Sequence, residues 1–509
     1  MDVFANLAVG LGLALQPLNL LMMVVGLVLG ITAGALPGIT MLNAIVLVLP
    51  FTYLMDITPA LLLMGGIYCG GVFAGSITGI LFNIPGDPMD VPATWEGYRL
   101  NRKGQVALAL GVAITASAIG GFASALLMTF ASPPFARIAL TFDQAEFFAV
   151  VVLGLASVVV IGQASMSSAF ISLLIGMTLG TVGVDPLYGS MRFTFGWKLL
   201  ESGIDFVTVM IGLFAIGEIL ERLELRSRGE DVGASRARAR LPRPSELWEL
   251  RGSILRGTAV GIGIGGLAGA GATVSSFVAY GVERQFSKKG DQFGTGVLEG
   301  VAAPEAAANG STGGAMIHLL TLGIPGSAAT AVMMGAFLIH GLQPGPLLFQ
   351  KQTAMVYTIF AGYLLINLIM IVLGLLAAVA FARILMVPEA ILAAFIVVCC
   401  FIGAYALRND LVDVWMMAAF GVIGYLMRRF KLPIPPLILG LILGPMAERF
   451  FRTSMATNGN DLMIFVTRPV SAVLLAIAAA LLIWPPLRTA LARRRAMPAL
   501  VAVEHDRTR

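Results

Sequence analysis

The chain has 509 residues, of which 58% are hydrophobic and only 12% are charged. A soluble domain of ordinary composition is about one quarter charged, so the composition excludes a soluble globular protein. The net charge of +5 comes mostly from Arg and Lys in short loops and at the C-terminus, which reports membrane topology and predicts no nucleic-acid partner.

Apolar stretches recur along nearly the whole length, and they predict an all-α polytopic membrane protein. About 20 apolar residues form a helix that crosses a hydrocarbon core of about 30 Å, and the length of the chain allows about 12 such helices. The start of the chain holds Asp2 but lacks the basic residues of a cleavable signal, so we expect the first helix to stay in the bilayer. The predicted spans are 18–36, 41–54, 59–84, 107–130, 145–161, 168–184, 204–220, 254–280, 302–324, 328–349, 357–386, 390–407, 412–427, 433–443 and 463–487.

One long charged segment, residues 221–253, interrupts these spans. Its arginines predict a cytoplasmic loop, and a further arginine cluster predicts a cytoplasmic tail over 493–509. The loop divides the chain into a first membrane repeat, 1–220, and a second membrane repeat with additional helices, 254–492.

The two halves repeat the same motifs in the same order. In each, a glycine-rich segment precedes a small polar segment and then an Ile-Pro-Gly sequence. These segments are 34–40, 75–79 and 83–87 in the first half, and 269–273, 309–314 and 323–327 in the second. The shared order and similar separations indicate an internal duplication.

The basic residues around the motifs indicate that the two copies are inverted. Arg99, Arg102 and Lys103 follow the first Ile-Pro-Gly sequence, whereas Lys288 and Lys289 precede the second. Inverted repeats with helices broken at matching points are a recurring build of secondary transporters, whose site lies near the middle of the membrane. We therefore expect two inverted repeats with broken helices or re-entrant hairpins.

Each Ile-Pro-Gly sequence should break a helix, because proline removes a backbone hydrogen bond and clashes with the preceding turn. In lipid such a break is tolerated only where it is buried in protein or lines a wet cavity, so two matched breaks predict one cavity. Half-helix N-termini there suit a carboxylate, and exposed carbonyl and hydroxyl groups suit a small cation. The candidate substrate or ion ligands are Gly38, Thr40, Asn43, Ser76, Thr78, Asn83, Pro85, Gly86 and Asp87 in the first half, and Asn309, Ser311, Thr312, Pro325, Gly326, Ser327 and Thr330 in the second.

Small and polar residues in membrane helices can also be purely structural. Small residues let membrane helices pack closely, as the series Gly26, Gly30 and Gly34 suggests. A helix cap at the break accounts for Asp87 equally well. Glu305 stands inside an apolar span, where an ionisable group is costly and indicates function.

Two histidines in the second half, His318 and His340, could relay protons, although a lone histidine is more often structural. The three cysteines show no disulfide framework or metal spacing. Enzyme signatures are also absent, since the sequence has no Gly-Lys dipeptide, no His-Glu-x-x-His and no Gly-x-Ser-x-Gly. We therefore expect a protein that is not an enzyme and has no cofactor.

At residues 34–40 and 321–330, continued through 334–345, the chain resembles the large membrane subunit of the tripartite tricarboxylate transporters. Length, hydropathy, the central basic loop and both glycine-rich repeats fit, so the resemblance covers nearly the whole chain. The signature positions of the family fall on Gly34, Pro37, Gly38 and Thr40 in the first copy and on Gly323, Pro325, Gly326 and Ser327 in the second.

The resemblance implies a multi-pass carrier of the bacterial inner membrane that imports citrate-like tricarboxylates or related carboxylates, driven by a sodium or proton gradient. It also implies a small membrane subunit of about four helices, a periplasmic solute-binding protein and, by analogy with other two-hairpin carriers, an elevator-like movement. A homodimer of the permease complex is a further possibility. The alternatives are a membrane channel, a carrier for another small organic solute and, with less support, a membrane-embedded enzyme.

Overall fold

The computed structural model describes most of the chain. The residues described are 2–36, 40–83, 85–161, 165–185, 189–217, 219–220, 240–267, 271–384, 394, 397–398, 400–405 and 410–483. The predicted tail 493–509 and most of the predicted basic loop, residues 221–239, lie outside them.

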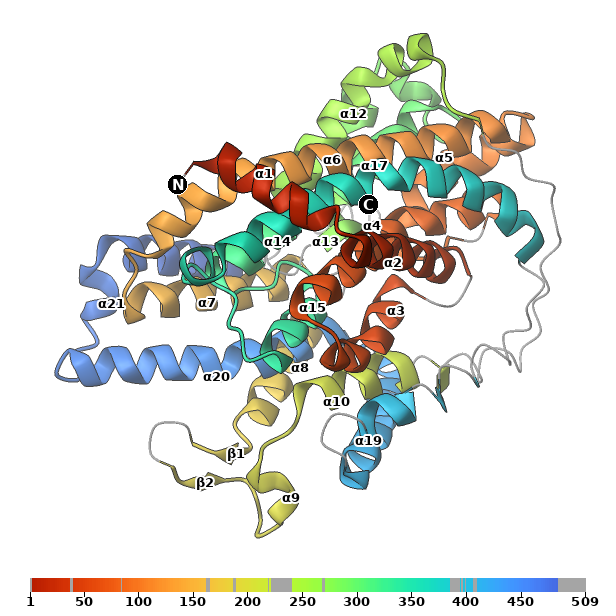
Figure 1. Cartoon of the computed structure of the whole chain (residues 1–509). Helices are drawn as coiled ribbons and strands as arrows, with labels where there is room; N and C mark the ends of the chain where they lie inside the picture. The colour runs from red at the N-terminus through yellow and green to blue at the C-terminus, as the bar shows by residue number, and fades with distance from the viewer. Residues whose placement is uncertain are drawn as a thin grey trace, which may run out of the picture.

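Nearly all regular structure in the described residues is helical (Figure 1). The elements of the first half are α1 Val3–Ala14, α2 Pro17–Ala35, α3 Met41–Val48, η1 Leu49–Leu54, α4 Ile57–Phe82, η2 Pro88–Asp90, α5 Val91–Arg102, α6 Val106–Ala139, α7 Gln144–Ile161, α8 Met166–Gly180, β1 Gly183–Val184, β2 Met191–Arg192, α9 Lys198–Glu201, α10 Phe206–Met210 and the π-helix η3 Ile211–Ile216. Those of the second half are α12 Pro244–Gly265, α13 Gly271–Phe286, η4 Gly290–Gln292, α14 Glu299–Leu322, α15 Ala328–Ile339, α16 Leu348–Lys351, α17 Thr353–Ile384, α19 Leu411–Arg429, α20 Ile434–Thr457 and α21 Ile464–Thr467.

Six of the described helices are long and apolar enough to cross a membrane, and several shorter apolar helices accompany them. The six are α2, α4, α6, α17, α19 and α20. The prediction of an all-α polytopic membrane protein is therefore confirmed, with a single two-stranded β ladder among the described residues as an addition to it. The expected number of about 12 crossing helices stays a prediction.

The two halves pack their first long helices in the same way. In α2 and in α12, three glycines spaced four apart lie against the backbone of α4 and α14 respectively, so closely that a Cβ atom would overlap a carbonyl group. These glycines are Gly26, Gly30 and Gly34 in α2 and Gly257, Gly261 and Gly265 in α12. Identical spacing in two helix pairs is what an internal duplication produces, and it gives the Gly26 series a packing role.

Both predicted helix breaks are present and match in detail. Helix α4 ends at Asn83 with φ 63°, and α14 ends at Gly323 with φ 71°. At both points the backbone leaves the helix in the left-handed conformation. In each break, the glycine of Ile-Pro-Gly lies against two helices that precede it, α2 and α4 in the first half and α12 and α14 in the second. A Cβ on Gly86 would lie 2.9 Å or less from the backbone of Gly34 and Gly75, and a Cβ on Gly326 would be equally close to that of Gly265 and Ala315.

The predicted single span 254–280 is wrong, because the chain forms two helices there. Helix α12 begins at Pro244, inside the segment expected as loop, and α13 begins at Gly271 with φ 56°. The two helices pack side by side as a helical hairpin, in which the Arg256 guanidinium bonds the Glu283 carboxylate at 2.7 and 2.8 Å. The glycine-rich connection lets the chain reverse, and hydropathy alone cannot reveal this reversal.

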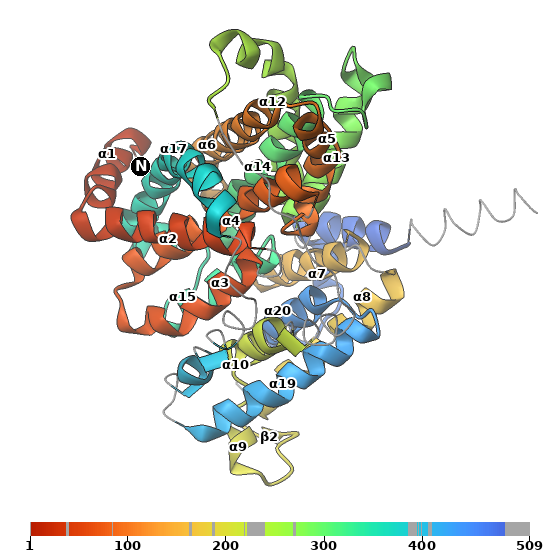
Figure 2. The ribbon, with the colours of Figure 1, turned by 90° about the vertical axis from the view of Figure 1, so that its right-hand side faces the viewer.

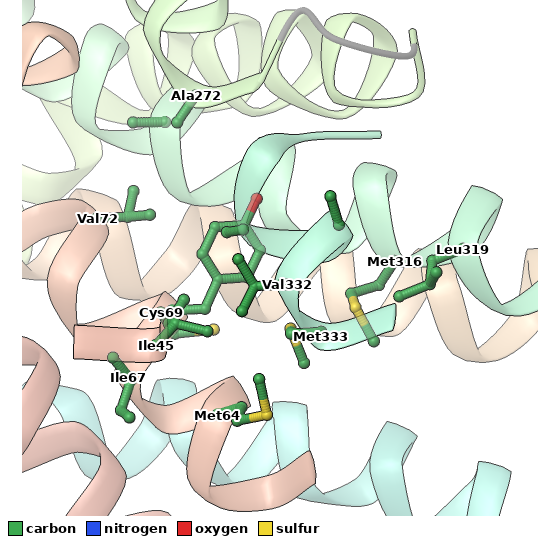
Figure 3. Packing of buried hydrophobic residues seen from close by; sticks show 14 of the residues in the cluster. Ile45, Met64, Ile67, Cys69, Val72, Ala272, Met316, Leu319, Val332 and Met333 are labelled. Atoms are coloured by element: carbon green, nitrogen blue, oxygen red, sulfur yellow. The ribbon is translucent and has the colours of Figure 1, made fainter. Parts of the chain in front are cut away.

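Helix α4 forms the centre of the fold. Every residue from Pro59 to Leu81 is buried, and the helix is apolar on all sides, as expected of a helix surrounded by others. Figure 3 shows part of this core, to which Met64, Ile67 and Cys69 of α4 and Val332 and Met333 of α15 belong. Helix α4 packs against α2 and α17, and α14 packs against α6, α12 and α13 (Figures 1 and 2).

A second group of helices lies beside the repeats. Helices α7 and α8 pack against α20, and η3 packs against α19, at the lower part of Figures 1 and 2. Near the short β1–β2 ladder, Arg192 and Arg452 bond the carboxylate of Glu448 at 2.6 and 2.8 Å. Helices α7, α8 and η3, which the sequence assigned to the first repeat, thus pack with helices from the end of the chain.

Candidate functional site

The two breaks lie at different points along the contact between α4 and α14. Toward the first break, Ser76 of α4 bonds Glu305 of α14. Toward the second, the hydroxyl of Tyr68 lies 3.1 Å from that of Ser327. Tyr68 and Ser76 are eight positions apart on α4, which is about 12 Å along an α-helix. The two breaks therefore lie along one buried contact of α4 with α14 and the start of α15, which we call the seam.

The first break meets the tip of the hairpin formed by α2 and α3. The Asp87 carboxylate accepts a hydrogen bond from the Met41 N–H at 3.4 Å, at the N-terminus of α3. Thr40 caps the same helix by accepting the Asn43 N–H at 3.3 Å. Because α3 carries a partial positive charge at this end, the Asp87 carboxylate occupies a place suited to an anion.

Three acidic residues gather at the first break. The Asp90 carboxylate accepts the Asp87 N–H at 2.8 Å and the Ser76 hydroxyl at 3.2 Å. The Glu305 carboxylate accepts hydroxyl bonds from Ser76 and, at 2.7 Å, from Ser117 of α6. Asp90 is 1% exposed and Glu305 2% exposed. This half of the seam is buried and acidic.

The second break carries hydroxyl groups and no carboxylate. Ser327 caps α15, since its hydroxyl accepts the Thr330 N–H at 3.2 Å and its own N–H donates to the Thr330 hydroxyl at 2.9 Å. The N-terminus of α13 is also here, because a Cβ on Gly271 would lie 3.6 Å from the Ser327 side chain. No Asp or Glu occurs between residues 306 and 338, so two helix N-termini meet in neutral surroundings.

The remaining predicted ligands differ in their positions and contacts. Thr78, Ser311 and Thr312 bond backbone carbonyls of their own helices, as packing residues do, and Thr312 also contacts Cys69. Asn309 is fully buried, and neither atom of its amide has a partner among the described residues. Asn83, Pro85, Gly86, Pro325 and Gly326 form the breaks themselves, whereas Gly38 and Pro37 lie outside the described residues.

The two histidines make the contacts of structural residues. His318 Nδ1 lies 3.2 Å from the Gly314 carbonyl of its own helix. His340 bonds the carbonyls of Ala336 and Met55 at 2.8 and 2.9 Å, which joins α15 to the segment before α4. These contacts lend no support to a proton relay.

Sequence reasoning left three residues of the seam out of the candidate set: Tyr68, Asp90 and Ser117. Asp90 had a usable signal, because Asp87 and Asp90 are spaced like Ser327 and Thr330 and form the same capping pair. Tyr68 and Ser117 had none, since their roles follow from how α4, α6 and α14 pack.

A buried carboxylate outside the breaks also joins the two halves. Glu96 of α5 is fully buried and accepts the Tyr280 hydroxyl at 2.7 Å. It also accepts the N–H groups of Gly296 and Val297 at 2.7 and 3.0 Å, in the loop before α14. This carboxylate fixes the first half of the chain to the end of α14 farther from the second break.

Comparison with known proteins places the chain among membrane transporters. A sequence model of the "Tripartite tricarboxylate transporter TctA family" matches residues 20–439. An uncharacterised 52.8 kDa protein in the TAR-I ttuC′ 3′ region of Agrobacterium vitis is 37% identical over 480 residues, which cover 94% of this chain and 95% of that protein. An uncharacterised protein in the TAR-II ttuC′ 3′ region of the same organism is 37% identical over 212 residues, which cover 42% and 88%. No solved structure matches the chain.

Proposed function

Because the chain belongs to the tripartite tricarboxylate transporter TctA family, we propose that it is the large permease subunit of a carrier for citrate-like tricarboxylates or related carboxylates. The carrier works in the bacterial inner membrane as a secondary transporter, driven by a sodium or proton gradient. A periplasmic binding protein delivers the substrate, and a small membrane subunit of about four helices completes the complex, by analogy with the family.

The observation that carries the proposal is the neutral second break. Helices α13 and α15 both begin there, and helix N-termini present free N–H groups and partial positive charge to an anion. The hydroxyl groups of Tyr68, Ser327 and Thr330 add donors for a second carboxylate oxygen. A substrate carboxylate can be held here without a buried arginine.

Transport follows from the arrangement of the breaks. A substrate held at the tips of one hairpin and one broken helix moves with them if the paired repeats shift as a body against the helices beside them. We assign that moving body to the two repeats and the fixed part to α7, α8, α19 and α20, in an elevator-like cycle. The other proposed ligands among the described residues, from Thr40 to Thr330, lie on the moving body in this scheme.

The decisive experiment is uptake of labelled citrate and a panel of dicarboxylates into vesicles that contain this chain and its small partner. Uptake should saturate, show counterflow, depend on the binding protein and follow an imposed sodium or proton gradient. Tyr68→Phe, which removes one hydroxyl donor, should raise the half-saturating substrate concentration about fivefold, the effect of losing roughly 1 kcal/mol. Tyr98→Phe is the matched control, because Tyr98 lies on α5, away from the second break.

Three results would contradict the proposal. Currents beyond the turnover of a carrier would favour a channel. Absence of uptake for every carboxylate in the panel, with the protein correctly inserted, would leave a carrier for another organic solute. Unchanged uptake by Tyr68→Phe would remove the second break as the carboxylate site.

A further inference from the structure

We propose that Ser76, Asp90 and Glu305 bind a sodium ion at the first break, and that this is the ion whose gradient drives uptake. The coupling of this ion to uptake rests on the proposed function. The ion site itself rests only on the contacts of side chains in this chain.

Three elements bring oxygen atoms to one point. Ser76 of α4 bonds both the Asp90 carboxylate, at 3.2 Å, and the Glu305 carboxylate. The second oxygen of each carboxylate is occupied elsewhere, by the Asp87 N–H at 2.8 Å and by the Ser117 hydroxyl at 2.7 Å. One oxygen of each carboxylate therefore faces the Ser76 hydroxyl.

The Ser76 hydroxyl has one hydrogen and cannot donate to both carboxylates at once. When both groups are ionised, one carboxylate receives this hydrogen and the other faces a lone pair of the hydroxyl oxygen. A cation between the three oxygens removes this repulsion, because every one of them can then act as a ligand.

The acidic side chains at this point have no cationic partner in the described part of the protein. Asp90 and Glu305 form no ion pair within the described part of the chain. Of the helices that carry Ser76 and Ser117, α4 has no charged residue and α6 has none before Arg137. Asp87 adds a further negative charge beside them, and Glu283 of α13 is already paired with Arg256. Buried carboxylates without a partner are costly.

An independent observation points to a ligand at the same place. Asn309 is one turn beyond Glu305 on α14, fully buried, with an amide that has no partner among the described residues. The two residues share the face that Glu305 turns toward Ser76, and side chains of a helix lean toward its N-terminus, here toward Glu305. From this shared face we infer that the Asn309 amide oxygen is a further ligand of the ion.

The ligand set selects the kind of ion. Hydroxyl, carboxylate and amide oxygens suit a hard cation, and softer metals prefer the nitrogen and sulfur ligands that this set lacks. Mg²⁺ retains several of its waters, which a group of side chains that are 98% or more buried does not favour. Sodium meets both conditions, and among hard cations it is the one whose gradient the proposed function names.

The test uses the purified full-length chain without substrate, so that it does not depend on the identity of the carboxylate. Thermal unfolding is followed as choline chloride is replaced by NaCl at constant ionic strength, with KCl and MgCl₂ in parallel. Sodium should raise the unfolding temperature with saturation, and potassium and magnesium should not. Glu305→Gln and Asp90→Asn should abolish the rise, and Asn309→Ala, which alters no charge, should raise the half-saturating sodium concentration at least tenfold.

Controls separate this site from other effects. Glu299→Gln changes a carboxylate on the same helix that pairs with Lys289 at 3.1 Å, and it should keep the full response to sodium. If either carboxylate variant fails to fold, Asn309→Ala and Ser76→Ala with labelled sodium binding still decide between the outcomes. A sodium response that survives in all site variants, or wild-type protein with no response or an equal response to magnesium, would overturn the proposal. Sodium binding with no carboxylate uptake would overturn only the proposed function.

Discussion

The two helix breaks have the same backbone and opposite chemistry. Both begin at a left-handed residue, contain Ile-Pro-Gly and lie against a glycine-lined helix pair. The first break places Asp87 and Asp90 where the second places Ser327 and Thr330, in the same capping pair. A duplicated scaffold thus supplies two positions, and a few side chains decide the sign of the charge that each one favours.

The two breaks also differ in what lies at the neighbouring helix N-terminus, that of α3 at the first break and that of α13 at the second. At the first break the N-terminus of α3 already has an anion, the Asp87 carboxylate. At the second break the corresponding residue is Ser327, whose hydroxyl leaves the N-terminus of α13 without a protein carboxylate. The proposed functions of the breaks follow from this difference, a cation at the acidic one and a carboxylate at the neutral one.

The largest effect is expected when the second break is given the chemistry of the first. Ser327→Asp should fold, because Asp is as good an N-cap as Ser, but its charge would occupy the place proposed for the substrate. Like charges brought together cost several kcal/mol, so initial rates of carboxylate uptake should fall at least about 100-fold.

Ser327→Asn is the matched control, since it is also a good cap and carries no charge. It should retain most of the uptake in the same vesicle assay. If the Asp variant transported as well as the Asn variant, the second break could not hold a carboxylate.

The sequence predicted the scaffold better than the chemistry of the site. Apolar length located most helices, and repeated motifs located both breaks, because both signals are local. The sequence wrongly predicted α12 and α13 as one span, because hydropathy does not distinguish a glycine-rich reversal inside an apolar run from a continuous helix. The contact of Ser76 with Glu305 depends on how α4 packs against α14, and that of Tyr68 with Ser327 depends on how α4 packs against the start of α15. No local pattern contains that information.

An intermediate effect should come from the scaffold that the two breaks share. Gly34→Ala and Gly265→Ala each place a Cβ against the backbone of the neighbouring helix, at matched positions of the two halves. Overpacking of this kind costs about 1–3 kcal/mol, and the two losses should be similar. Thermal unfolding of the purified protein measures them.

Gly263→Ala is the control for this pair, because nothing lies within 4 Å of a Cβ at that position of α12. It should leave the stability unchanged or raise it by up to about 1 kcal/mol, since Ala favours a helix over Gly. If only one of Gly34→Ala and Gly265→Ala were destabilising, the two halves would not pack alike.

The smallest effect is expected when the first break loses one of its three charges. Asp87→Asn keeps a capping side chain for α3 but removes a negative charge near Asp90 and Glu305. A charge at this distance contributes on the order of 1 kcal/mol or more, so the half-saturating sodium concentration for uptake should rise about fivefold while the maximal rate changes little. Asp56→Asn, which changes a carboxylate at the opposite end of α4, should have no effect. Unaltered sodium and pH dependence in Asp87→Asn would show that Asp87 is only a helix cap, and the cation site would then consist of Asp90 and Glu305 without its help.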